Sequence, residues 1–330
     1  MKKPQNVVVF GELLMRLDAS HSNRFVQAEN YQASFTGGEA NVAVALAQWG
    51  IVSSIVSRVP SHSIGQACVN HFRRYGVRTE SVLRGGDRLG LFFVESPVPP
   101  RSGQVIYDRD ATAFRTLQPG DIDWDLTLAD ADWFHFTGTA PANGENVREV
   151  LAEGIQTARK RGVTISFDCG YRSQLWTIEE AAKVLPRFME MSDVFIGSEH
   201  DARTFFDVHS QGTESLRDLS EKYTLKTVAY TDRNISSLGM HRYQATIHEN
   251  GKTATSRIHE VTPLDRIGTG DAFTAGLVLG QLQERSLQST VEFATAAAAL
   301  THSIHGDFAL LSIDEIEGLA NGDSIGRIRR

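Results

Sequence analysis

The segment 265–271, Asp-Arg-Ile-Gly-Thr-Gly-Asp, places two glycines at alternate positions just before a carboxylate. It is too glycine-rich for a strand or a helix interior, but from Asp271 onward apolar residues recur at helical spacing. Alternate glycines let successive backbone N–H groups point the same way, at the positive end of the following helix. The sequence therefore predicts an anion site at Gly268, Thr269 and Gly270. Asp271 at its edge is either a helix cap or a general base.

The composition indicates a soluble globular protein. The 330 residues are 41% hydrophobic and 22% charged, with a formal net charge of −7. This charge argues against a nucleic-acid partner. The apolar run 7–10 is too short for a signal peptide or a membrane span, so we expect a cytoplasmic protein without a membrane partner. Two isolated cysteines and eleven scattered histidines show no metal-ligand spacing, and no metal-ligating residue is assigned.

Short apolar runs alternate with amphipathic helical segments along most of the chain. This alternation predicts an α/β fold with a doubly wound, mainly parallel sheet and helices on both faces. Ligands of such sheets bind beyond the carboxyl ends of the strands, where Thr137, Asp168, Ser198 and Thr231 stand. The predicted strands are 6–10, 52–59, 133–137, 164–168, 194–197 and 226–231, and the predicted helices include 40–49, 63–75, 147–161 and 295–304.

A second, smaller sheet is predicted within the same domain, which we take to span residues 1–330. The runs 90–95 and 104–109 alternate like half-exposed strands, so lid strands are expected at about 13–35 and 88–115. Tyr107 and Arg109 are two residues apart, so both leave the same face of a strand. They either face a ligand or form a cross-strand pair on an exposed sheet.

Two signatures resemble those of the ribokinase-like, or phosphofructokinase-B type, sugar kinases. The run from Asp265, Asp-x-x-Gly-x-Gly-Asp-Ala-Phe-x-Ala-Gly, matches the C-terminal signature except for Thr269, which is commonly Ala, and GGEANVAVALAQWG at 37–50 is similar to the N-terminal one. The resemblance implies a ribokinase-like fold with a lid over the sugar, and lids that pair into a homo-oligomer. It implies ATP and Mg²⁺ as cofactors, with a monovalent cation such as K⁺ near Asp265 as a further possibility. It implies that the Gly-x-Gly-Asp amides stabilise the transferring phosphoryl group, that Asp271 removes the hydroxyl proton, and that Gly37 and Asn41 contact the sugar.

The preferred substrate is a sugar acid. Residues 168–176 resemble the D-x-N-Y-R-x-x-L-W motif of 2-keto-3-deoxygluconate kinases, with Gly170 in place of Asn. Arg172 could donate two parallel hydrogen bonds to a carboxylate, and Arg109 would add a second positive charge. Arg16 stands where kinases of neutral sugars often have an Asp, and an arginine cannot accept hydrogen bonds from hydroxyls. The expected reaction is ATP-dependent phosphorylation of 2-keto-3-deoxygluconate to its 6-phosphate. A kinase of a neutral ketose such as fructose, or a non-catalytic sugar- or nucleotide-binding regulator, stays open.

The nucleotide side departs more from the family pattern. Ser198 and Asp201 stand where the family has Asn-x-x-Glu, a segment that organises magnesium, and 231–239 lacks the usual glycine loop. We assign Ser198, Thr231, Gly268 and Gly270 to the nucleotide.

Overall fold

The computed structural model describes residues 4–20, 23–98, 100–236 and 239–322. Its main sheet has ten strands, and the path β11-β10-β9-β8-β1-β4-β5 is parallel throughout. β12, β13 and β14 extend one edge in antiparallel pairing. This confirms the predicted mainly parallel sheet. The strands are β1 (Asn6–Phe10), β4 (Val52–Val59), β5 (Val82–Arg84), β8 (Trp133–Thr137), β9 (Thr164–Asp168), β10 (Val194–Gly197), β11 (Thr227–Ile235), β12 (His241–Glu249), β13 (Lys252–Thr255) and β14 (His259–Val261).

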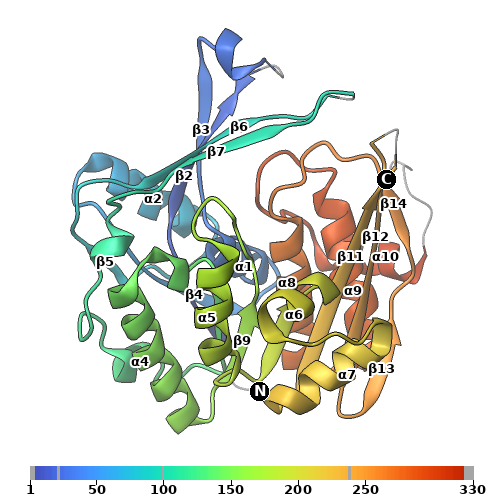
Figure 1. Ribbon diagram of the computed structural model, residues 1–330. Coiled ribbons are helices and arrows are strands. Elements are labelled where there is room, and N and C mark those ends of the chain that lie inside the picture. The colour runs from blue at the N-terminus through green and yellow to red at the C-terminus, as the bar shows by residue number, and fades with distance from the viewer. Residues whose placement is uncertain (1–3, 21–22, 99, 237–238, 323–330) are drawn as a thin grey trace.

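Helices cover both faces of this sheet (Figure 1). The alternating side chains of β1 show why, since Val7 and Val9 join one apolar core while Val8 and Phe10 join the other. The first core also takes side chains from α1 (Gly38–Gln48), α2 (Ser63–Arg74), α8 (Thr269–Leu282), α9 (Leu287–Thr301) and α10 (Ile313–Asn321). The second takes them from α3 (Trp124–Thr127), α4 (Glu145–Arg161), α5 (Ile178–Met189), α6 (Glu199–Phe206) and α7 (Gly212–Tyr223). Within the described ranges, no helix is long and apolar enough to cross a bilayer.

A separate four-stranded sheet lies across one end of the main sheet, at the top of Figure 1. Its order is β3-β2-β6-β7, with β2 (Leu14–Ala19), β3 (Tyr31–Thr36), β6 (Gly90–Glu95) and β7 (Gln104–Asp108). The predicted second sheet is therefore present.

The structure differs from expectation after residue 231. β11 continues to Ile235 and pairs with β12 over its whole length, from Thr227 opposite Glu249 to Ile235 opposite His241. Residues 231–235, where a glycine loop is usual in the resembling family, are thus part of a strand, and their side chains alternate between its two faces. A turn at Asn250 and Gly251 joins β12 to β13.

Candidate active site

A pocket of about 700 Å³ lies between the small sheet and the carboxyl ends of the main-sheet strands. The strand-end residues Thr137 and Asp168 line it, as the sheet topology predicts. The structure brings together every residue that the sequence singled out for substrate, nucleotide or catalysis: Gly37, Asn41, Tyr107, Arg109, Arg172, Ser198, Thr231, Gly268, Thr269, Gly270 and Asp271.

The anion loop, defined here as residues 265–271, turns sharply into α8. Gly268 is the N-cap with φ of 83°, a left-handed conformation that favours glycine, and a Cβ there would overlap the carbonyl oxygen of Asp307. A Cβ on Gly270 would instead meet no atom within 4 Å. Because the first N–H groups of a helix have no intrahelical acceptor, this open side of the loop presents donors to the pocket.

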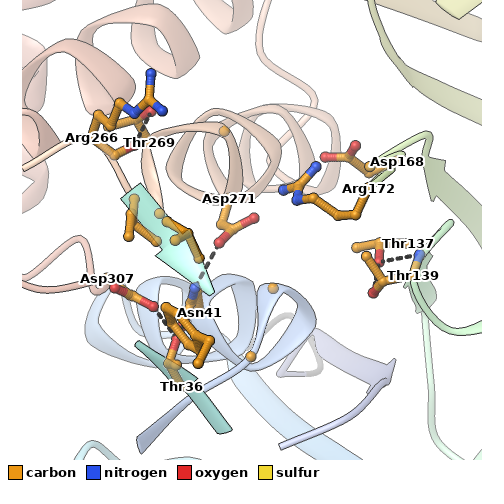
Figure 2. A pocket seen from close by; sticks show the side chains of 18 of the residues that line it. Thr36, Asn41, Thr137, Thr139, Asp168, Arg172, Arg266, Thr269, Asp271 and Asp307 are labelled. Atoms are coloured by element: carbon orange, nitrogen blue, oxygen red, sulfur yellow. Dashed lines mark hydrogen bonds between the residues drawn. The ribbon is translucent and has the colours of Figure 1, made fainter. Parts of the chain in front are cut away.

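Asp271 is in the first turn of α8, not at its cap. Its Oδ2 accepts a hydrogen bond from Asn41 Nδ2 at 2.6 Å, as Figure 2 shows. Burial, with the nearby Asp168 and Asp307 carboxylates, raises the pKa of Asp271 to about 8, although the Asn41 hydrogen bond and Arg172 lower it. The helix-cap interpretation is therefore wrong, and a carboxylate that titrates near neutral pH suits a general base.

The turn between β3 and α1 faces the anion loop. Thr36 Oγ1 lies 2.8 Å from Asn41 Oδ1, which orients the amide so that its nitrogen faces Asp271. A Cβ on Gly38 would lie 3.7 Å from Asp271 Oδ1, so the two glycine-containing signatures meet at the carboxylate.

Arg172 follows β9, and Figure 2 shows its guanidinium group near Asp271 and Asp168. Among the described residues its one hydrogen bond runs to the carbonyl oxygen of Tyr171, at 3.0 Å. Burial raises the pKa of Asp168 to about 6, and the Arg172 charge and a hydrogen bond from Thr274 oppose this shift. The Gly170 backbone has φ of 48°, which glycine and asparagine tolerate best, so its exchange with Asn in the motif is conservative.

Arg109 also lines the pocket, but its charge is compensated. Its Nε and Nη2 donate to Glu12 Oε2 at 2.8 and 2.5 Å, and both side chains are buried. Tyr107 packs on Phe92 at 5.7 Å between ring centroids, on the pocket side of the small sheet. Of the two fixed charges expected for a sugar acid, Arg109 is therefore held by a carboxylate, whereas Arg172 donates to a carbonyl oxygen among the described residues.

Arg16 does not face the pocket. Its side chain is 0% exposed and donates to the carboxylates of Asp18, Asp265 and Asp307. Sequence reasoning placed Arg16 at a sugar-facing position, which is wrong because these three buried carboxylates hold its guanidinium.

Two arginines in the pocket were missed. Arg233, on the unexpected extension of β11, and Arg266, in the anion loop, both line the pocket with exposed side chains. Both belong to the lining of the same pocket, where partial desolvation and the positive charge of Arg266 lower the pKa of Arg233. The sequence held a signal for each of them. Arg233 is two residues after Thr231, so both leave the same face of a strand, and Arg266 lies inside the C-terminal signature. Other pocket residues that were not assigned are Glu39, Thr139, Asp265 and Asp307.

Ser198 and Asp201 form a capping box at the start of α6. Ser198 N–H and Oγ donate to Asp201 Oδ2 at 2.9 and 2.7 Å, and Asp201 N–H donates back to Ser198 Oγ at 3.2 Å. The side chains that stand in for Asn-x-x-Glu therefore also fix the helix that borders the pocket.

Comparisons with known proteins agree with this geometry. The chain is 30% identical over 322 residues to 2-dehydro-3-deoxygalactonokinase of Haloferax volcanii, covering 97% of this chain and 98% of that one. The crystal structure of 2-dehydro-3-deoxygluconokinase of Thermotoga maritima aligns with a TM-score of 0.94 at 37% identity, covering 97% and 99%. A putative ribokinase II of E. coli, solved with ATP and Mg²⁺, shares the fold with a TM-score of 0.84 at 20% identity, covering 96% and 99%. The model of the pfkB family of carbohydrate kinases matches residues 4–312, and the chain belongs to this family of ribokinase-like carbohydrate kinases.

Proposed function

We propose that this kinase transfers the γ-phosphoryl group of ATP to a hydroxyl of a sugar acid, with 2-keto-3-deoxygluconate as substrate and its 6-phosphate as product. The observation that carries the proposal is the position of Asp271, which lies at the edge of an open anion loop and near Arg172, whose hydrogen bond among the described residues runs to a carbonyl oxygen and not to a carboxylate. A general base, an anion cradle and a carboxylate-binding cation are the parts that this reaction needs.

The reaction divides among residues of the pocket. Asp271 takes the proton from the attacking hydroxyl, and Asn41 holds its carboxylate in place. The N–H groups at the start of α8, with Gly270 open toward the pocket, stabilise the charge of the transferring phosphoryl group. Positioning and charge stabilisation supply most of the rate in phosphoryl transfer.

Arg172 selects the acid. Because Glu12 compensates Arg109, a substrate carboxylate finds its counter-charge at Arg172. The relatives named above as 2-dehydro-3-deoxygalactonokinase and 2-dehydro-3-deoxygluconokinase act, by their names, on keto-deoxy sugar acids. We propose the same substrate class here.

Arg233 and Arg266 serve the nucleotide, together with Ser198, Thr231 and the anion loop. A triphosphate carries several negative charges, and two neighbouring guanidinium groups are suited to it. Asp168 and Asp201 both line the pocket, and their carboxylate oxygens are of the kind that Mg²⁺ and its bound waters prefer, so these are the residues that would hold the ion. When bound, the ion neutralises the phosphate oxygens.

The small sheet acts as a lid in this proposal. Gln174, in the loop that carries Arg172, contacts β7 through Val105 O at 3.2 Å and Tyr107 N at 3.4 Å, so lid and strand-end loop meet over the pocket. The outward face of the lid exposes Tyr31 and Ile106, and we propose that a second copy pairs there.

The test is a coupled ADP-release assay over 2-keto-3-deoxygluconate, its galacto epimer, 5-keto-2-deoxygluconate and fructose, with wild type and Arg172→Met. A closed guanidinium–carboxylate pair contributes about 1.5 to 3 kcal/mol, or roughly ten- to a hundredfold in affinity. We expect a kcat/KM for the preferred acid at least about a hundredfold above that for fructose, and loss of most of this preference in Arg172→Met. The control is Arg187→Met, because Arg187 pairs with Glu149 at 2.8 Å on the surface of α5.

Equal use of fructose by the wild type would favour the neutral-ketose kinase. Binding of sugar and ATP without turnover of any substrate would favour the non-catalytic regulator.

A further inference from the structure

Arg16 is the largest fully buried side chain among the described residues, and it lies between the small sheet and the anion loop. It extends from β2, where Asp18 two residues on shares its face and accepts from Nε at 2.9 and 3.0 Å. Its Nη2 donates to Asp265 Oδ2 at 2.6 Å, and its Nη1 donates to Asp307 Oδ1. One guanidinium thus joins three carboxylates from separate parts of the chain.

Two of these carboxylates hold the anion loop. Asp265 begins the loop, and its Oδ1 accepts from Ile267 N–H at 3.1 Å. The carbonyl oxygen of Asp307 packs against Gly268 so closely that no Cβ fits between them. The position of the loop therefore depends on Asp265 and Asp307, and both depend on Arg16.

The same contacts reach Asp271 from the other side. Thr36 Oγ1 lies between two acceptors, Asp307 Oδ2 and, at 2.8 Å, Asn41 Oδ1, and its single proton can serve one of them at a time, while Asn41 Nδ2 donates to Asp271 Oδ2 at 2.6 Å. Figure 2 shows this row of side chains from Asp307 through Thr36 and Asn41 to Asp271. A displaced Asp307 would release the amide that orients Asp271.

We propose that Arg16 is a positioning residue for phosphoryl transfer, a built-in cation that fixes the anion loop and orients Asp271, and that this kinase therefore needs no monovalent cation near Asp265. The guanidinium already donates to Asp265 Oδ2, which also lies 3.3 Å from Gly306 N–H, so the carboxylate that a bound cation would use is engaged. The residues present do not fit an added K⁺ beside Arg16, since two cations at one carboxylate pair would repel each other.

The inference rests on the proposed function only for its kinetic arm. In that arm, wild type, Arg16→Lys and Arg16→Met are assayed in KCl and in tetramethylammonium chloride at equal ionic strength. Wild-type kcat should agree within about twofold between the salts, whereas both variants should lose at least about tenfold in kcat with little change in the KM of the sugar acid. Added guanidinium or K⁺ should recover part of the loss in Arg16→Met.

A binding arm does not depend on the substrate. K⁺ that occupies the vacated position binds only the folded protein, so it should raise the melting temperature of Arg16→Met above its value in tetramethylammonium, and it should leave that of the wild type unchanged. Arg88→Met is the matched control, because Arg88 pairs with Asp108 at 2.7 Å at the edge of the small sheet, away from the loop. It should behave like the wild type in both arms.

If K⁺ is needed for wild-type turnover, or raises the melting temperature of the wild type, then Arg16 does not replace a bound cation. If Arg16→Lys keeps the wild-type kcat, then Arg16 has no positioning role. If Arg16→Met does not fold, Arg16→Lys and the wild-type salt comparison decide. If the wild type turns over no sugar, the proposed function is wrong instead, and the melting experiment still tests whether Arg16 takes the place of a bound cation.

Discussion

Replacement of Asp271 by Asn should abolish base catalysis while leaving the site intact. Asn is nearly isosteric, and its side-chain oxygen can still accept the 2.6 Å hydrogen bond from Asn41 Nδ2. Loss of a positioned base costs about 10²- to 10⁴-fold in kcat, or roughly 2.7 to 5.5 kcal/mol of activation free energy. KM values for sugar acid and ATP should change little, which the ADP-release assay measures directly.

The pH profile of the wild type gives a second measure of the same carboxylate. With a pKa of about 8, only about 1% of Asp271 is ionised at pH 6 and roughly 90% at pH 9, so kcat/KM should rise nearly a hundredfold between them. The variant should lose this rise. Near-wild-type turnover in Asp271→Asn, or an unchanged pH dependence, would refute the assignment of Asp271 as the base.

Three further outcomes follow from the same geometry. Gly270→Ala should keep its melting temperature but lose at least about tenfold in kcat, because its Cβ has room yet projects at the anion site. Gly268→Ala should lose stability too, since its φ is 83° and Asp307 blocks the Cβ. Equal melting temperatures of the two variants would contradict this contrast. Arg233→Met and Arg266→Met should each raise the KM for ATP about tenfold without changing the KM of the sugar acid, and a change confined to the sugar acid would move these arginines to the other subsite. Asp271→Asn should have a higher melting temperature than the wild type at pH 8 and the same melting temperature at pH 4. The raised pKa means that the protonated carboxyl favours the folded state at low pH and that this contribution is lost as pH rises toward 8. A variant less stable than the wild type at pH 8 would count against the raised pKa.

The sequence predicted the parallel sheet, the second sheet and the residues that gather at the strand ends, because hydrophobic periodicity and glycine signatures are local signals. It could not predict compensation between charges. Glu12 and Arg109 are distant in sequence and meet only in the fold, and nothing near Arg16 marks Asp265 and Asp307 as its partners. The extension of β11 was missed for a similar reason, since the polar residues 232–234 have no strand pattern until β12 pairs with them.

The hydrogen bonds that unite the pocket have a consequence for synthesis of the protein. Asn41 meets Asp271 across 230 positions of sequence, and Arg16 meets Asp307 across 291 positions. A ribosome-bound chain that still lacks residues 265–330 has neither the base nor the loop, and Arg16 is then a cation without Asp265 and Asp307, two of its three partners. Contacts so distant in sequence are costly to close and form late in folding. Enzymatic activity should therefore appear only once Asp307 has left the ribosome and met Arg16, which makes it a sensitive reporter of complete folding.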